Sequence, residues 1–242
     1  IIIDGNSKDG TIEIIKQNED CIDFWLSEDD KGIYNAWNKA IKYIRGEWVI
    51  FLGAGDLIYS NDVLSNISIH LSNAFPKFNL VYGKVLLLDD NHSIINEFGQ
   101  PWNILKNKWK TIRPSLPPHP SCFLHTSFFE EKKYSFPEDL KIAGDSHLLM
   151  KAVIDKEPLF VPMYINRMLF GGVSTSGDGL LQIINEIKQI NKEFNIKPPF
   201  QIYYWNLSKL YFKVVINKVL PKKAHKVIYN NYLKTKFKFK SG

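Results

Sequence analysis

The sequence of 242 residues predicts an α/β fold. Residues 46–56 read GEWVIFLGAGD, in which a short apolar run from Trp48 to Leu52 is followed by glycines and by Asp56. An apolar run of this length without alternation is typical of a strand buried on both faces of a parallel sheet. Along the chain, β-forming runs alternate with segments whose apolar residues recur at helical spacing, and this alternation is the pattern of an α/β sheet.

Asp56 is a candidate metal ligand. Open α/β sheets bind their ligands at the carboxyl ends of strands, and Gly53 and Gly55 let the backbone approach a ligand closely. A carboxylate at such a position can hold a divalent metal, which in turn can hold a diphosphate. The alternative interpretation is that Asp56 only begins a turn.

The N-terminal quarter predicts two strand–helix units. Residues 1–3 and 24–26 are short runs of β-forming residues, and each is followed by a polar turn. A helix is expected to begin near Ile12, and a second helix is expected over 33–44, where apolar residues recur at helical spacing. Gly46 is suited to ending that second helix.

The later part of the chain predicts a hairpin, a loop and further helices. Residues 80–88 and 93–98 flank a polar turn and predict two antiparallel strands. Four prolines in 101–118 predict a mobile loop over a site. Ala143 and Gly144 precede a helix at Asp145, which either caps that helix or serves a site. Late strands are expected over 160–170, a flexible loop over 171–177 that can close on phosphate, and a helix over 178–194.

Charge divides the chain unevenly. The whole sequence carries +6; because residues 194–242 contain eleven lysines and no acidic residue, residues 1–193 carry −5. This asymmetry predicts a catalytic body over 1–193 and a basic tail over 194–242 with an anionic partner. Cys21 and Cys122 give neither a disulfide framework nor a zinc spacing, which favours a reducing compartment. No signal peptide or membrane-spanning run is present.

Three passages, taken together, resemble bacterial family 2 glycosyltransferases of the GT-A fold, in the branch that builds O-antigens, capsules and exopolysaccharides. IIIDGNSKDGT resembles the family's strand and turn at the nucleotide base. SEDDKGIYNAWNKAIKYIRGEWVIFLGAGD resembles its "SE-x-D-x-GIYDAMNKG" run and the acidic motif after it. HPSCF, IAGDSHLLMKA and FGGVSTSG resemble the acceptor-side half. The likeness covers 1–177 and implies a Rossmann-like mixed sheet flanked by helices.

The resemblance implies a role for particular residues. Asp145 would be the catalytic base and Asp56 the surviving acid of the metal-binding motif. Residues placed at the donor nucleotide sugar would be Asp4, Asn6, Asp29, Gly32, Asn35, Asn38 and Asp56. Residues on the acceptor side would be Trp102, His119 and His147, each of which is more often a packing or capping residue.

The resemblance also implies a reaction. A hexose would pass from a nucleotide-diphosphate sugar, with UDP-sugars favoured, to a saccharide hydroxyl with inversion, and Mn²⁺ or Mg²⁺ would stabilise the leaving diphosphate. Two features depart from the family pattern. Asp56 stands where two or three acids are common, which should weaken metal affinity, and the strand and helix that members carry ahead of the IIIDG strand do not occur in this sequence. These departures favour the alternative function, a catalytically inactive GT-A scaffold of a polysaccharide assembly complex.

The basic tail predicts a helix lying on the cytoplasmic face of the membrane, where a lipid-linked acceptor would be found. In residues 202–220, Lys209, Lys213 and Lys218 fall near one helical face. Another face is apolar and consists of Tyr204, Leu207, Leu210, Tyr211, Val214 and Val215. The alternative is that this apolar stripe packs on the body or forms a homodimer. Binding to nucleic acid is disfavoured because the tail lacks arginine and the body is acidic.

Overall fold

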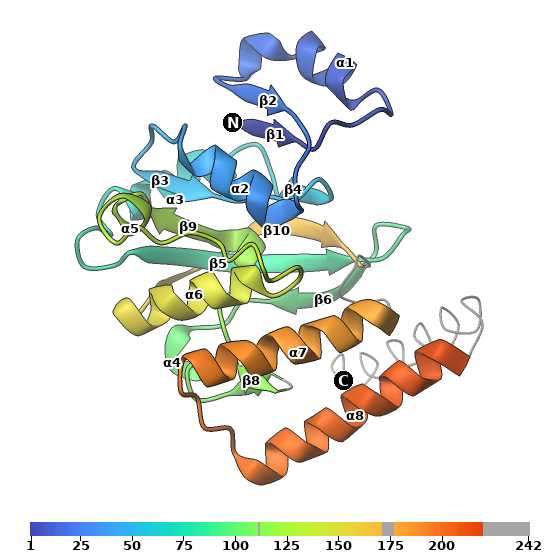
Figure 1. Ribbon diagram of the computed structural model, residues 1–242. Coiled ribbons are helices and arrows are strands. Elements are labelled where there is room, and N and C mark those ends of the chain that lie inside the picture. Colours follow the sequence, from blue (N-terminus) through green and yellow to red (C-terminus); the bar gives the residue numbers. More distant parts are fainter. Residues whose placement is uncertain (111, 171–176, 220–242) are drawn as a thin grey trace.

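The computed structural model describes residues 1–110, 112–170 and 177–219. Figure 1 shows a central sheet with helices on both faces, a small separate sheet at one end of the molecule and the helix α8 at the opposite end. The predicted α/β class is therefore confirmed.

The N-terminal unit is a two-stranded parallel sheet, in which Asp4 lies opposite Ser27. A polar turn and a short helix connect its strands, as predicted from the sequence. Gly32, whose φ of 120° suits glycine, then begins the helix α2. The elements are β1 (Ile2–Asp4), α1 (Thr11–Gln17), η1 (Glu19–Cys21), β2 (Trp25–Ser27) and α2 (Ile33–Ile41).

The central sheet has six strands in the order β3-β9-β5-β10-β4, and β6 pairs with the distal half of β5. Only β5 and β10 run parallel, and the other pairs are antiparallel. The predicted hairpin is confirmed as β5 and β6. The strands are β3 (Trp48–Ile50), β4 (Asp56–Ile58), β5 (Leu80–Leu88), β6 (Ile94–Phe98), β9 (Cys122–His125) and β10 (Leu159–Leu169).

The prediction that residues 48–52 form a strand buried in a parallel sheet is wrong. β3 covers only Trp48–Ile50, is half-buried, lies at the end of the strand order and pairs antiparallel with β9. Its run is apolar because alternate residues pack on opposite faces: Val49 against the first core cluster, and Trp48 and Ile50 against the second. An edge strand that is covered by helices on both faces therefore has the same apolar sequence pattern as a central strand.

Two core clusters sandwich the central sheet. On one face, Leu80 and Tyr82 of β5 pack with α2 and with α6 (Gly144–Asp155). On the other face, Val81 packs against α3 (Val63–Leu71). Successive residues of β5 thus enter opposite clusters, as the pleat of a strand requires.

The predicted loop over 101–118 contains short ordered elements. Arg113 and Lys110 face each other across a two-stranded ladder. His119 follows in a 3-10 turn that leads into β9. The short elements of this region are α4 (Trp102–Leu105), β7 (Trp109–Lys110), β8 (Arg113–Pro114), η2 (His119–Ser121) and α5 (Ser127–Glu130).

Two long helices complete the described chain, α7 (Gly177–Glu193) and α8 (Phe200–Val219). They pack on each other around a third core cluster. Between them, Phe194 and Ile196 pack against the first cluster, so the start of the basic tail is attached to the body. Most of the predicted phosphate-closing loop, at 171–176, lies outside the described residues. No helix in the described ranges is long and apolar enough to cross a membrane.

Candidate active site

Asp56 closes a tight turn after β3. Its backbone N–H donates to the carbonyl of Gly53 at 3.0 Å, and Gly53 N–H donates back to Asp56 Oδ2 at 2.9 Å. The glycines that the sequence placed here therefore form the turn that aims this carboxylate. Burial raises the pKa of Asp56, which the Gly53 N–H and the nearby His119 act to lower.

A buried imidazole links Asp56 to Asp145. His119 is 8% exposed and stacks on Trp37, with ring centroids 4.9 Å apart. Burial lowers the pKa of His119, while the charges of Asp145 and Asp56 act to raise it. The structure thus brings three predicted site residues, Asp56, His119 and Asp145, around one point of the fold.

Asp145 lies in the first turn of α6, which begins at Gly144, so Asp145 is not its N-cap residue. Its Oδ1 accepts the N–H of Ser146 at 2.6 Å, and its side chain is half-buried. Gly144 is required here, because a Cβ at this position would lie 2.7 Å from the ring of Tyr34. The Tyr34 hydroxyl in turn donates to the carbonyl of Ile142 at 2.7 Å, which fixes α2 against the start of α6.

A buried carboxylate holds the loop that leads to Asp145. Glu186 of α7 is 6% exposed and accepts three backbone N–H groups. Their donors are Lys141 to Oε1 at 2.8 Å, Ile142 to Oε2 at 2.9 Å and Ala143 to Oε2 at 2.7 Å. The sequence reasoning did not find Glu186, because nothing in a helical run marks one of its acids as turned inward.

Two cations of the 101–118 region also face Asp145. The charge of Asp145 acts to raise the pKa of both Lys110 and Arg113, against the lowering caused chiefly by burial. Arg113 donates to the carbonyl of Pro114 at 3.1 Å, and Lys110 Nζ lies 5.0 Å from the ring centroid of Phe98. These cations were also missed, although the sequence did place a loop over the site at this point.

The predicted nucleotide-side residues divide into two groups. Asp4, Asn6 and Asp29 gather at the carboxyl ends of β1 and β2. Asp4 accepts Ser27 Oγ at 2.6 Å and Ser7 N–H at 3.0 Å, and these two hydrogen bonds lower its pKa. Asn6 donates to Asp29 Oδ1 at 2.9 Å.

The second group lies on α2 and at its start. These residues hydrogen-bond to other protein groups and do not point into open space. Asn35 donates to Glu138 Oε2 at 2.9 Å and Asn38 to Glu138 Oε1 at 3.0 Å. Asn38 also exchanges hydrogen bonds with the backbone of Phe136, at 2.8 and 2.9 Å. Gly32 donates its N–H to Asp30 at 2.8 Å. These contacts tie α2 to the loop ahead of α6, and a donor-binding role for the asparagines stays a prediction.

The other two predicted acceptor-side residues make contacts that do not involve Asp145. His147 is buried, and its Nε2 is 2.8 Å from Glu193 Oε1 at the end of α7. Trp102 begins α4, which reaches the far end of α6 through the ion pair between Lys106 and Glu157 at 2.8 Å. Since α6 has 12 residues, its far end is about 18 Å from its first turn, where Asp145 lies. Of the three acceptor-side predictions, His119 is the one whose pKa the charges of both Asp56 and Asp145 act to raise.

Whether a metal ion fits at Asp56 depends on the side-chain donor atoms present there. Among the described residues, no three His, Cys, Asp or Glu side chains are grouped to hold an ion. Asp56 alone offers a carboxylate, of which one oxygen is engaged by Gly53. Mg²⁺ in nucleotide enzymes is commonly held by one or two carboxylates together with substrate phosphates and waters. The residues present fit a metal of that kind, which arrives with a diphosphate.

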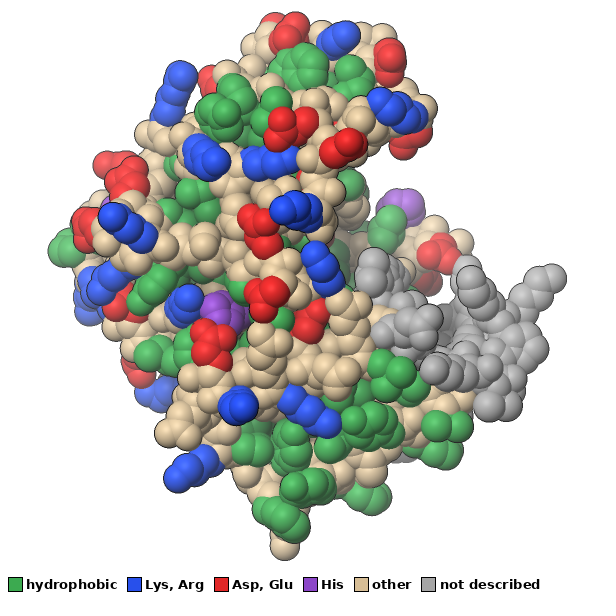
Figure 2. Space-filling model, viewed as in Figure 1, with side chains coloured by type: hydrophobic (Ala, Val, Ile, Leu, Met, Phe, Trp, Pro, Cys, Tyr) green, Lys and Arg blue, Asp and Glu red, His purple; other side chains and the backbone are tan. Residues whose placement is uncertain are grey.

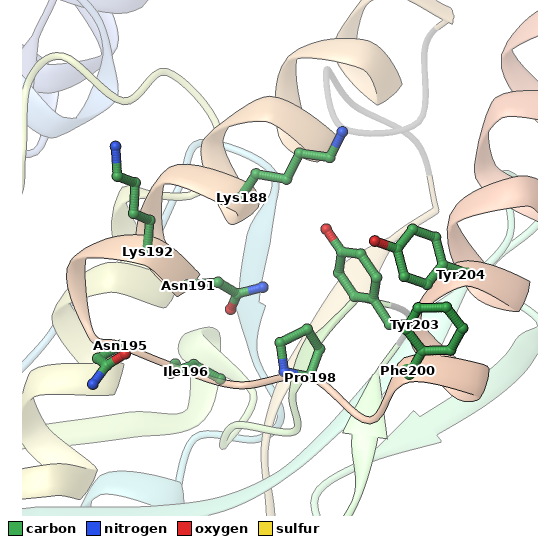
Figure 3. Close-up of a pocket in the computed structure, with 9 residues that line it drawn as sticks. All are labelled: Lys188, Asn191, Lys192, Asn195, Ile196, Pro198, Phe200, Tyr203 and Tyr204. Atoms are coloured by element: carbon green, nitrogen blue, oxygen red, sulfur yellow. The ribbon is translucent and has the colours of Figure 1, made fainter.

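A separate pocket of about 370 Å³ lies between α7 and α8 (Figure 3). Figure 3 shows Lys188 on α7 and the rings of Tyr203 and Tyr204 on α8 among the residues that line it. Lys192 and Phe200 also line it, but none of the predicted catalytic residues does. Its cations and aromatic rings come from α7 and α8, at the end of the molecule where the basic tail begins.

Comparison with known proteins finds likenesses over parts of the chain and a shared fold. Residues 1–73 match the family model described as glycosyl transferase family 2. The chain is 31% identical over 94 residues to a PGL/p-HBAD biosynthesis glycosyltransferase of Mycobacterium bovis, covering 38% of this chain and 36% of that protein. It is 29% identical over 109 residues to the UDP-Glc:alpha-D-GlcNAc-diphosphoundecaprenol beta-1,3-glucosyltransferase WfgD of Escherichia coli, covering 45% and 42%. The chain thus spans about two fifths of the length of these curated relatives.

Two solved structures share the fold. TarS 1–349 of S. aureus in complex with UDP-GlcNAc superposes with a TM-score of 0.53 at 18% identity, covering 75% of this chain and 54% of that one. The mannosyltransferase PcManGT of Pyrobaculum calidifontis, in complex with GDP-Man and Mn²⁺, superposes with a TM-score of 0.55 at 16% identity, covering 96% and 69%. The predicted GT-A fold is therefore confirmed.

Proposed function

We propose that this chain, whose likenesses support a family 2 glycosyltransferase, transfers a sugar from a nucleotide-diphosphate sugar to a saccharide hydroxyl with inversion. The observation that carries the proposal is the pair Asp56 and Asp145. They come from the two halves of the chain, and both act on the buried imidazole of His119. Two carboxylates so placed suit sugar transfer. That reaction needs a site for the leaving diphosphate on one side of the anomeric carbon and a base on the other side.

Asp145 is proposed as the general base. As the acceptor oxygen bonds to the anomeric carbon, the carboxylate takes the hydroxyl proton, and the bond from that carbon to the diphosphate breaks. A half-buried carboxylate at a fixed helix start suits this role, because Glu186, Gly144 and Tyr34 hold the segment around it. Inversion follows from attack on the face opposite the leaving group.

Asp56 is proposed to face the departing diphosphate. A divalent metal, Mn²⁺ or Mg²⁺, would neutralise charge on that group when bound, and Asp56 is the residue that would hold it. The nucleotide is proposed to lie along the ends of β1 and β2, near Asp4, Asn6 and Asp29. UDP is the favoured nucleotide, because TarS was solved in complex with UDP-GlcNAc and the name of WfgD gives UDP-Glc as its donor.

The acceptor is proposed to be a lipid-linked saccharide in surface polysaccharide biosynthesis. The support is the relative WfgD, whose name gives a diphosphoundecaprenol acceptor. Lys110 and Arg113, which face Asp145, would suit the phosphates of such an acceptor. The corresponding location is the cytoplasmic face of the bacterial membrane, where lipid-linked saccharides are assembled.

One observation favours the alternative, an inactive scaffold. Among the described residues, Asp56 belongs to no group of three or more His, Cys, Asp or Glu side chains that could hold a metal, and Asn35 and Asn38 bind Glu138. A scaffold of this kind would bind UDP no better with Mn²⁺ than without it. Isothermal titration of UDP with Mn²⁺ and with EDTA separates the two functions.

The decisive experiment is a screen of nucleotide sugars with Mn²⁺, read by thermal shift and by release of nucleoside diphosphate. The proposed function predicts a stabilising shift and slow hydrolysis with at least one UDP-sugar. The Asp145→Asn variant should keep the thermal shift and lose the hydrolysis. If no nucleotide sugar produces a shift or turnover in the parent chain, transfer by this chain is excluded.

A further inference from the structure

We infer that the outer face of α8 docks on an anionic lipid bilayer, with the helix lying in the plane of the headgroups. The outer face is defined by Trp205 and Phe212, with Ile202 and Val215 on its flanks. The inference deepens the proposed function by locating the surface that meets the membrane. It differs from the face that the sequence suggested.

The face of α8 that packs on the body includes part of the apolar stripe that the sequence predicted would meet the membrane. Leu207, Leu210 and Tyr203 pack against the third core cluster, and Val214 is 5% exposed. These residues are spaced four, three and four apart, which places them on one side of the helix. Leu207, Leu210 and Val214 of the predicted membrane stripe therefore face the body and are unavailable to a bilayer.

The opposite face is also apolar and is open to solvent. Trp205 is 64% exposed and Phe212 is 67% exposed, and because they lie seven residues apart they share one side of the helix. A helix that is apolar all round is normally buried on all sides. Figure 2 shows hydrophobic side chains gathered at the lower end of the molecule, where α8 lies in Figure 1.

Charge identifies what covers this face. The sequence from 194 onward contains eleven lysines and no acidic residue, so α8 itself contains no negative charge. Lys209 lies over the ring of Trp205, with Nζ 4.7 Å from the centroid, which puts a cation at the edge of the aromatic surface. Aromatic residues flanked by lysines suit an interface whose surface is anionic and whose interior is apolar.

The pocket between α7 and α8 adds to the same surface. Lys188 and Lys192 line it, and Lys188 Nζ is 3.1 Å from the hydroxyl of Tyr211 on α8. Tyrosine hydroxyls and lysine ammonium groups are the donors that a phosphate headgroup accepts. A lipid headgroup entering beside α8 would therefore meet two cations at the depth where the aromatic face ends.

The test is co-sedimentation of the full 242-residue chain with vesicles of phosphatidylglycerol or of phosphatidylcholine, at low and high salt and without nucleotide sugar. Binding to the anionic vesicles at low salt is expected, with little binding to the neutral ones. Trp205→Ser/Phe212→Ser should weaken the partition coefficient by roughly tenfold for each side chain removed. Lys188→Gln/Lys192→Gln should weaken binding only to the anionic vesicles.

A matched control lies on α3, where Leu64 is 54% and Ile69 is 67% exposed. Leu64→Ser/Ile69→Ser removes exposed apolar surface elsewhere and should leave vesicle binding unchanged. The inference is overturned if the parent chain stays in the supernatant at low salt, or if the Trp205 and Phe212 double variant binds like the parent.

A third result would assign the face to a homodimer. Light scattering would then show a dimer that the same double variant dissociates, together with no vesicle binding by the parent chain. Because substrates are absent throughout, a failure here is distinct from a failure of the transferase proposal, which the nucleotide-sugar screen decides.

Discussion

Glu186 accepts the backbone N–H of Ala143 at 2.7 Å, two residues before Asp145. A buried carboxylate of α7 therefore determines where the proposed base begins its helix. The same carboxylate also accepts the N–H groups of Lys141 and Ile142. The helix ahead of the basic tail is thus structurally joined to the proposed catalytic centre.

Glu186→Ala should lower the free energy of unfolding by about 2–4 kcal/mol, because it leaves backbone donors in a mostly buried loop without an acceptor. Urea denaturation measures this. The control is Gln182→Ala, since Gln182 only donates to Glu186 Oε1 at 2.9 Å, and its cost should stay below about 1.5 kcal/mol. A positioning role further predicts that Glu186→Gln lowers kcat with an unchanged donor KM. Equal stability of parent and Glu186→Ala would contradict the anchoring role.

Asp145→Asn should reduce transfer by about 10²–10⁴-fold, the usual contribution of a general base, and should leave donor affinity unchanged. Initial rates and donor titrations measure the two effects. The matched control is Asp20→Asn, a change at an exposed acid in η1, which should behave like the parent. Near-parental turnover in Asp145→Asn would remove this residue from the mechanism.

Asp56→Ala should abolish any rise in nucleotide affinity caused by Mn²⁺, while binding of nucleotide in EDTA stays the same. The physical reason is that Asp56 is the lone carboxylate proposed to share a metal with the diphosphate. For the parent chain, calorimetry should detect Mn²⁺ binding only when UDP is present. Tight binding of Mn²⁺ to the nucleotide-free protein would mean that the metal is held elsewhere.

The buried carboxylate of Asp56 should also affect stability with pH. Burial raises its pKa in the folded state above the ordinary value of 3.8, so the folded state binds this proton more tightly than the unfolded state. Stability from this group is therefore present at low pH and is lost as the pH rises through the folded pKa. Asp56→Asn should stabilise the chain at pH 7 and have little effect below pH 3.8, as measured by urea denaturation.

The pKa of His119 reports how close each of the two carboxylates lies to its imidazole. Each negative charge favours the imidazolium, so Asp56→Asn and Asp145→Asn should each lower the pKa of His119 below that of the parent. NMR titration of the imidazole measures this, with the resonance identified by its loss in His119→Gln. Asp62→Asn, at an exposed acid ahead of α3, serves as the control and should leave the titration unchanged. An unmoved titration in both site variants would show that neither carboxylate lies close enough to His119 to act on it.

The sequence by itself predicted most local elements and singled out Asp56 and Asp145 as candidate site residues. Periodicity predicted the strands and helices of the first fifty residues and the hairpin of β5 and β6, because apolar spacing along a segment reports which face it buries. A turn at Asp56 is the alternative interpretation of that residue, and the structure has one between Gly53 and Asp56, where glycine tolerates a tight chain reversal. Motif order pointed to the GT-A fold, which the comparisons confirm.

Tertiary structure alone decided which segments meet. β3 reads like a central strand but pairs antiparallel at an edge, and α8 is apolar on both sides, so local pattern could not say which side packs. Glu186 and Asp145 lie 41 positions apart, and Glu186 meets the loop ahead of α6 only once α7 packs against it. Contacts between distant residues depend on how whole faces fit together, and the spacing of residues within one segment does not specify its partner.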